Sequence, residues 1–162
     1  MTSSRKPSVP PGPDTPDVPN APDTPDTPEA PRPPGAGADL SDRLARERNV
    51  WLCCVRADGS PHVTPVWFVF LRERWWIGVH ASSVKARLVA RSARVSLALE
   101  DGDRPVVAEG EVRVHREDFP PEVVAAYITK YDRDPREPYE AGERTLLLEV
   151  GVRRWLMRGE AR

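Results

Sequence analysis

Short runs of apolar and alternating residues, separated by turn signals, recur along the chain from residue 50 onward. The runs 50–57 and 62–71 flank Asp58-Gly59, a dipeptide that favours a two-residue hairpin turn with positive φ. Four further runs rich in β-branched or aromatic residues are also predicted as strands: 75–79, 94–100, 105–115 and 145–155. The pattern therefore predicts six antiparallel strands.

Helical spacing of apolar residues appears in three short segments between or before these runs. The first segment begins at Asp39 or Ser41 and ends near residue 48, and the second covers 83–91. The third covers 117–130 and carries Pro120-Pro121 in its first turn, where proline is tolerated. The predicted fold class is mainly β with short helices (α+β), a six-stranded antiparallel split β-barrel.

Composition divides the chain near Asp39. Residues 1–38 hold twelve of the nineteen prolines and no aromatic residue, so they have too little apolar surface to offset the entropy of ordering. Ten of these prolines recur every third residue, the period of a polyproline II helix. We predict a disordered proline-rich tail over 1–38, either a semi-rigid spacer or a docking ligand, and one folded domain over 39–162.

Charge and hydropathy restrict the classes of partner and compartment. The net charge is −1 and no run of eighteen apolar residues occurs, so nucleic acid and membranes are not expected as partners. No signal peptide is visible, which predicts a cytoplasmic protein that acts on a small-molecule substrate. Adjacent Cys53 and Cys54 are expected to be buried free thiols, and the three histidines are too scattered in sequence to predict a metal site.

Three further features concern surfaces and irregularities of the predicted barrel. Trp75 and Trp76 are adjacent on a strand, so they point to opposite faces, and some aromatic surface is expected to meet a partner subunit or a ring. Residues 132–144 are long enough for a lid, but a plain connector fits the sequence as well. Gly151 is a candidate β-bulge.

A candidate anion site lies where the strand 75–79 leads into the second helix. Ser82 and Ser83 can cap that helix, whose exposed N–H groups attract anions, and Lys85 adds a full positive charge. His80 lies between the strand end and the serines, within reach of a bound phosphate, although a partly exposed loop histidine is the plainer interpretation. The predicted ligand is a phosphate.

At this point the chain resembles the pyridoxamine 5'-phosphate oxidase-like split β-barrel superfamily, and in particular its flavin- and deazaflavin-dependent members. The resemblance covers roughly residues 44–156, and its specificity lies in the order and spacing of the motifs. The residues that carry it are Gly59, Pro61, Pro65, Val66, Trp67, Phe68, Ser83, Lys85, Leu88 and 94–97.

The resemblance implies a homodimer that holds FMN or the deazaflavin coenzyme F-420 at the subunit interface. The implied cofactor-binding residues are Thr64, Pro65, Val66, Trp67, Gly78, Val79, His80, Ser82, Ser83 and Lys85. Thr64, Val69 and Val84 stand where the vitamin B6 oxidases carry cationic residues, so pyridoxamine phosphate oxidation is disfavoured. The choice between FMN and deazaflavin stays open.

The expected function is a flavin- or deazaflavin-dependent oxidoreductase. Such a cofactor performs the hydride chemistry itself, so the lack of a recognisable catalytic triad does not count against an enzyme, and no catalytic side chain is assigned. Two alternatives remain: a dimeric module that carries flavin, deazaflavin or haem without turnover, and a structural or regulatory protein whose tail recruits a partner.

Overall fold

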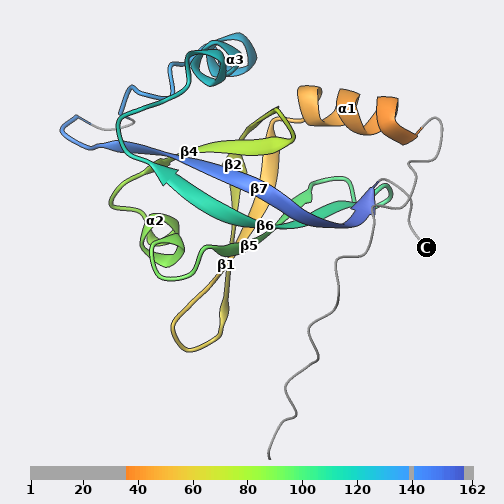
Figure 1. Ribbon diagram of the computed structural model, residues 1–162, viewed down its shortest axis with the longest axis horizontal. Coiled ribbons are helices and arrows are strands. Elements are labelled where there is room, and N and C mark those ends of the chain that lie inside the picture. Colours follow the sequence, from red (N-terminus) through yellow and green to blue (C-terminus); the bar gives the residue numbers. More distant parts are fainter. Residues whose placement is uncertain (1–35, 139–140, 159–162) are drawn as a thin grey trace, which may run out of the picture. The chain divides into compact units, whose positions relative to one another are not determined.

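Seven strands form one antiparallel sheet within residues 36–138 and 141–158, the part of the chain that the computed structural model describes (Figure 1). The sheet order is β2-β1-β5-β6-β7-β4-β3. The strands are β1 (Asn49–Val55), β2 (Pro61–Trp67), β3 (Val69–Leu71), β4 (Arg74–His80), β5 (Arg94–Leu99), β6 (Val106–His115) and β7 (Thr145–Arg158). The predicted class, mainly β with short helices, is confirmed. The predicted tail, 1–38, lies almost entirely outside the described residues.

The predicted strand 62–71 is two strands in the structure. β2 ends at Trp67, β3 begins at Val69, and Phe68 between them belongs to neither. β2 and β3 occupy opposite ends of the sheet order, yet this single residue joins them. The two edges of the sheet therefore meet at Phe68, and the sheet must curl on itself to bring them together. This break accounts for seven strands in place of the six expected.

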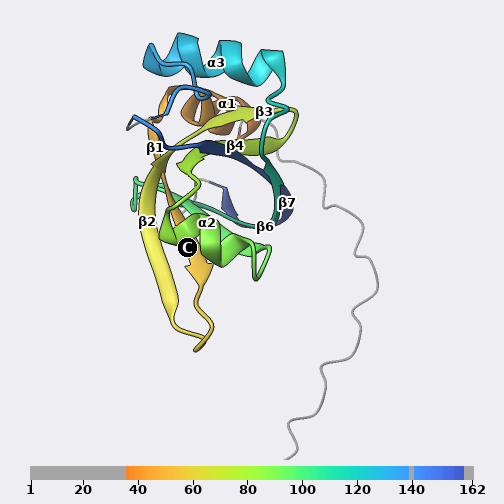
Figure 2. The same ribbon diagram turned by 90° about the vertical axis from the view of Figure 1, so that its left-hand side faces the viewer.

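The three helices described are α1 (Ala36–Arg46), α2 (Val84–Val89) and α3 (Pro121–Tyr131), close to the predicted segments. Ser83 caps α2, because its hydroxyl accepts a hydrogen bond from the N–H of Ala86 at 3.2 Å. α3 carries proline in its first turn, as expected. α2 lies across one end of the curled sheet, and α3 lies outside it, beyond β3 and β4 (Figure 2).

The hairpin between β1 and β2 differs in one detail from the prediction. The Gly59 N–H donates to the Arg56 carbonyl at 3.0 Å, and the Arg56 N–H donates to the Ser60 carbonyl at 2.9 Å. Gly59 has a φ of 83°, whereas Asp58 is not among the positive-φ residues. The connection is therefore a three-residue loop in which only glycine needs the left-handed conformation, rather than a two-residue turn.

An irregularity does occur near Gly151, but two residues farther along β7. The register with β6 pairs Gly110 with Val152 and Glu109 with Arg154, so Arg153 is the extra residue of a bulge. At Gly110 an added Cβ would lie 2.4 Å from the Gly151 carbonyl oxygen. The two glycines thus allow a close backbone approach, while the bulge itself is at Arg153.

The tryptophans are distributed between two apolar clusters. Trp75 is fully buried in the barrel core, and adjacent Trp76 packs in a second cluster with Val123 and Tyr127 of α3. Neither side chain of this pair is exposed, because α3 covers the face of the sheet on which Trp76 lies. Trp51 on β1 stays 40% exposed.

Two tyrosine hydroxyls of α3 satisfy backbone groups at the break between β2 and β3. The Tyr131 hydroxyl accepts from the Phe68 N–H at 2.9 Å and lies 2.6 Å from the Phe68 carbonyl oxygen. The Tyr127 hydroxyl accepts from the Gly78 N–H at 2.9 Å and lies 3.1 Å from the Trp67 carbonyl oxygen. These side chains are four residues apart and so lie on one face of the helix. Tyr127 thus connects β2 to β4, which do not pair, and Tyr131 holds the residue between β2 and β3.

Replacing Tyr131 by Phe tests this arrangement. The buried Phe68 N–H would lose its acceptor, so we expect the free energy of unfolding to fall by about 1–3 kcal/mol. Urea denaturation measures the change. Thr129→Val on the same helix removes an exposed hydroxyl and should change stability by less than about 0.5 kcal/mol. Equal stabilities for the two variants would contradict the role of the Tyr131 hydroxyl.

Candidate functional site

The ten predicted cofactor-binding residues occupy three segments: β2, the end of β4, and the turn into α2. Tyr127 draws two of them together, because its hydroxyl contacts the backbone of both Trp67 and Gly78. Val66 and Val79 are buried in the barrel core, so they can offer a ligand only backbone groups. Pro65 is exposed, and Thr64 donates its hydroxyl to the Pro65 carbonyl at 3.4 Å.

The Trp67 side chain is already engaged within the subunit. Its ring stacks on Tyr131 with centroids 4.6 Å apart and planes 5° from parallel. The guanidinium carbon of Arg48 lies 5.7 Å from the Trp67 ring centroid, which adds a cation–π contact. Trp67 therefore fixes the end of β2, and its indole is not free to rotate toward a ligand.

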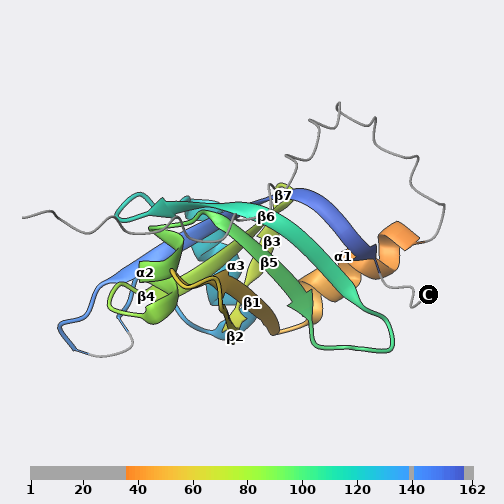
Figure 3. The same cartoon turned by 90° about the horizontal axis from the view of Figure 1, so that it is seen from below.

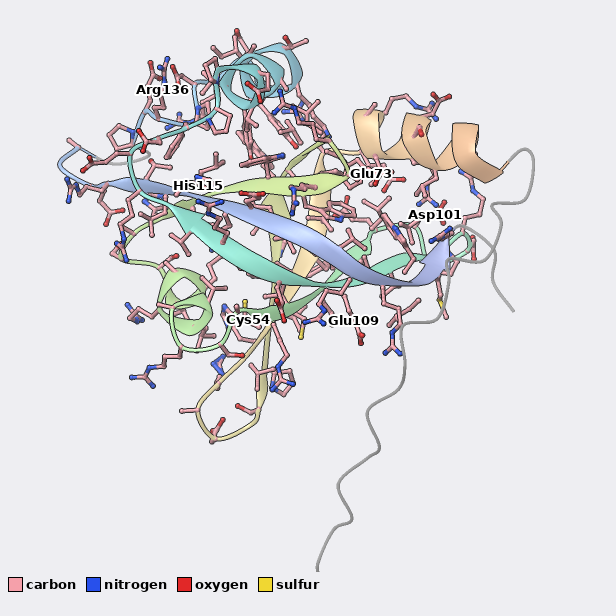
Figure 4. The ribbon with its side chains drawn as sticks, in the orientation of Figure 1. Cys54, Glu73, Asp101, Glu109, His115 and Arg136 are labelled. Atoms are coloured by element: carbon pink, nitrogen blue, oxygen red, sulfur yellow. The ribbon has the colours of Figure 1, made fainter. Side chains whose placement is uncertain are left out.

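Lys85 belongs to a cluster of positive groups at the open edge of β2. Its charge acts on Cys54 of β1, which lies beside α2 (Figure 4), and on His62 of β2. Nη2 of Arg56 lies 3.0 Å from Nδ1 of His62. Burial lowers the pKa of His62, and the charges of Arg56 and Lys85 lower it further. Lys85 and Arg56 supply the positive charge and His62 an uncharged imidazole. These three residues, called the cation cluster from here on, favour a bound anion.

Sequence reasoning missed His62 and selected His80. A signal for His62 was present in the hairpin, since the pairing of β1 with β2 sets His62 opposite Cys54, with both side chains on the inner face. Applying that register to the sequence would have placed His62 beside the residues that α2 covers. The register depends on the three-residue loop, which the sequence pattern did not distinguish from a two-residue turn.

His80 and Ser82 meet a carboxylate from the segment 132–144. Ser82 donates its hydroxyl to Oε1 of Glu143 at 2.9 Å, and Nδ1 of His80 contacts Oε2 of the same residue. These hydrogen bonds, that of Ser82 first, hold the pKa of Glu143 below its usual range. A negative charge therefore lies at the two residues expected to face a phosphate. At the start of α2, an anion is therefore favoured on the side where Lys85 lies and not on the side of Glu143.

Both cysteines are free thiols, and they point to opposite faces of β1 as expected. Cys54 is buried, and this burial, followed by the neighbouring Cys53, raises the pKa of its thiol to about 11. Cys53 is only half-buried and lines a groove on the outer face of the sheet. That groove contains none of the ten predicted cofactor residues.

The described residues were also considered for a metal site and for a membrane-spanning helix. Within 36–138 and 141–158, no three histidine, cysteine or acidic side chains converge as metal ligands. None of the helices in this part of the chain is long and apolar enough to cross a bilayer.

A comparison with models of protein families covers most of the chain. Residues 38–157 match the model of the family described as pyridoxamine 5'-phosphate oxidase. The chain belongs to this family. A search of functionally curated proteins found no significant match.

Solved structures of the same fold carry several different descriptions. A conserved hypothetical protein, Rv2991 of Mycobacterium tuberculosis, is 26% identical over 73% of this chain and 81% of its own, with a TM-score of 0.57. An F420 reductase is 22% identical over 71% of this chain and 94% of its own, with a TM-score of 0.56. The haem storage protein HutZ of Vibrio cholerae is 15% identical over 76% of this chain and 95% of its own, with a TM-score of 0.63. The last two likenesses establish the fold alone.

The cation cluster predicts a measurable coupling between Lys85 and His62. In Lys85→Ala we expect the His62 pKa to rise toward the ordinary value, because a neighbouring positive charge no longer opposes protonation. Proton NMR of the histidine ring resonances between pH 5 and 8 measures it. Arg46→Ala, an exposed change on α1, serves as the control and should leave the His62 titration unchanged. An unaltered His62 titration in Lys85→Ala would remove Lys85 from the cluster.

Proposed function

We propose that the protein is an oxidoreductase that binds FMN or deazaflavin coenzyme F-420 and transfers hydride between this cofactor and a small organic substrate. The observation that carries the proposal is the cation cluster at the edge of β2, in a chain of the pyridoxamine 5'-phosphate oxidase family. Both cofactors contain a phosphate, and guanidinium, ammonium and imidazole groups are suitable donors for one.

The residues beside the cluster fit the rest of such a cofactor. Lys85 and Arg56 would hold the phosphate, and the Thr64 hydroxyl is a hydrogen-bonding group on the same strand as His62. Pro65 has no N–H, so it cannot donate to a ring. The cofactor, when bound, supplies the hydride acceptor and donor, and the backbone of β2 would orient it. Tyr127 and Tyr131 keep this strand end in place by their hydrogen bonds to Trp67 and Phe68.

The structure disfavours the vitamin B6 oxidase reaction at two positions. Val69, which stands where those enzymes carry a lysine, is 3% exposed and packs in the cluster under α3. Val84 is exposed at the start of α2 and carries no charge that could assist Lys85. The positive charges at this site come instead from Arg56 and Lys85, beside the neutral imidazole of His62, which suggests a different substrate.

The absorption spectrum of the purified protein after denaturation identifies the cofactor, because FMN, deazaflavin and haem absorb at different wavelengths. We expect FMN or deazaflavin, and titration of the apoprotein with each should give a defined affinity. Lys85→Ala should weaken that affinity by about 1.5–3 kcal/mol, the range for a lost charge-assisted hydrogen bond. Arg46→Ala, an exposed change on α1, should leave it unchanged.

A haem spectrum would identify the haem-carrying alternative. Binding of flavin or deazaflavin without reduction or oxidation of any substrate would favour a cofactor carrier without turnover. Equal affinities of the wild type and Lys85→Ala would show that the cation cluster does not hold the phosphate.

We further propose that the working unit is a homodimer. The outer face of β1 and β2 presents Trp51, Val63 and Pro65 to solvent, with Val63 53% exposed. The strand register sets Trp51 directly opposite Pro65, so these side chains form one apolar patch, and β2 is a free edge of the sheet. Such a patch on an edge strand is typical of an interface, and a second copy would cover it.

Light scattering tests this proposal with a matched pair of variants. The wild type should have twice the mass of one chain at micromolar concentration, and Val63→Glu should shift it toward the monomer, because a carboxylate would be buried in the interface. Ile128→Glu places the same charge on the exposed face of α3, where Ile128 is 44% exposed, and should leave the dimer intact. A monomeric wild type would contradict the proposal.

A further inference from the structure

A groove of about 850 Å³ lies on the outer face of β1, β5, β6 and β7, strands that lie side by side in the sheet (Figure 3). Its volume is within the range of small-molecule sites. Glu109, labelled in Figure 4, marks the β6 part of its wall. The groove borders the apolar patch through Cys53, which the strand register sets opposite Val63, and it shares Arg56 with the cation cluster.

The lining of this groove is strongly positive. Five arginines face two glutamates, which gives a net charge of +3 in a chain whose overall net charge is −1. The arginines come from four separate segments: the loop after β1, the turn after α2, the start of β5 and the bulge of β7. The charged residues are Arg56, Arg91, Arg94, Arg153, Arg154, Glu109 and Glu111. Only tertiary folding brings them together.

The β7 bulge explains why two consecutive arginines line one groove. In a regular strand Arg153 and Arg154 would point to opposite faces, but the extra residue at Arg153 breaks that alternation. Arg153 pairs with Glu111 at 2.5 Å, and Arg154 pairs with Glu109 at 2.9 Å. The glutamates hold these two guanidinium groups in place along the wall.

Arg91 and Arg94 differ from this pair. Both are exposed, and among residues 36–138 and 141–158 neither has a carboxylate within ion-pair distance. Ser92 and Ser96, which can donate hydroxyl hydrogen bonds, lie in the same lining. The groove thus combines two positioned arginines with two whose charges are not neutralised.

We propose that this groove binds a small polyanion, a molecule that carries at least two phosphate or carboxylate groups. Arg91 and Arg94 supply the charges that attract it, since a guanidinium fork matches either group with two parallel hydrogen bonds. Arg153, Arg154 and the two serines complete the donor set. The groove does not include Lys85 and shares only Arg56 with the proposed phosphate contact, so the polyanion, if the proposed function holds, is a substrate or effector that binds beside the cofactor.

Calorimetric titration with tripolyphosphate and with citrate tests the site and distinguishes the two anion types. We expect the wild type to bind at least one of them, with an affinity that falls as NaCl is raised. The double variant Arg91→Ala, Arg94→Ala should bind at least about tenfold more weakly. Ser96→Glu, which adds a negative charge to the wall, should abolish binding. Thermal melts establish that each variant is folded.

The control double variant Arg46→Ala, Arg116→Ala removes the same charge from exposed positions outside the groove and should bind as the wild type does. An equal loss in both double variants would overturn the proposal, because the effect would then be one of overall charge. Absence of binding of both anions at millimolar concentration would also overturn it. So would a much tighter complex with a short DNA duplex, which would make the groove part of a nucleic-acid surface.

Discussion

The hydrogen bonds of Tyr127 and Tyr131 are the interactions on which the rest of the structure depends. A curled sheet whose two edge strands are joined by one residue leaves backbone groups at that residue without strand partners, and burial makes such groups costly. The tyrosine hydroxyls provide the missing partners at Phe68 and Gly78. The ammonium of Lys130 lies 3.9 Å from the Phe68 ring centroid, and its own burial lowers its pKa to about 8. Helix α3 therefore closes the barrel in two ways: it covers the sheet, and its tyrosine hydroxyls hydrogen-bond the backbone of the joined strands.

That closure also positions the candidate site. β2 ends at the residue that Tyr127 contacts, and the inner face of the same strand carries His62 toward Lys85. The start of α2 is divided electrostatically, with Glu143 beside His80 and Ser82 on one side and the cation cluster on the other. An anion is repelled from the first side and attracted to the second. The segment 132–144 thus contributes to the site through Glu143, whether or not it moves as a lid.

The outer face of the sheet has a different character along its length. Trp51, Val63 and Pro65 make one end apolar, while the arginines and glutamates of the groove make the other end charged. Both features arise from residues that alternate with buried ones on the same strands. A second subunit on the apolar patch would leave the charged groove at the border of the interface, where a ligand can contact the protein near a cofactor.

The sequence by itself determined the class of fold, most element bounds, the Ser83 cap and the family, because these depend on local periodicity, turn residues and motif order. It could not show that residue 68 interrupts a strand, since the apolar run 66–70 continues unbroken and only the closing sheet forces the break. It placed Lys85 but not its neighbours: His62, Arg56 and Glu143 come from segments distant in sequence or from a register set by one loop residue. Tertiary structure decided the site because Coulomb interactions and hydrogen bonds act over a few ångströms in space, irrespective of separation along the chain.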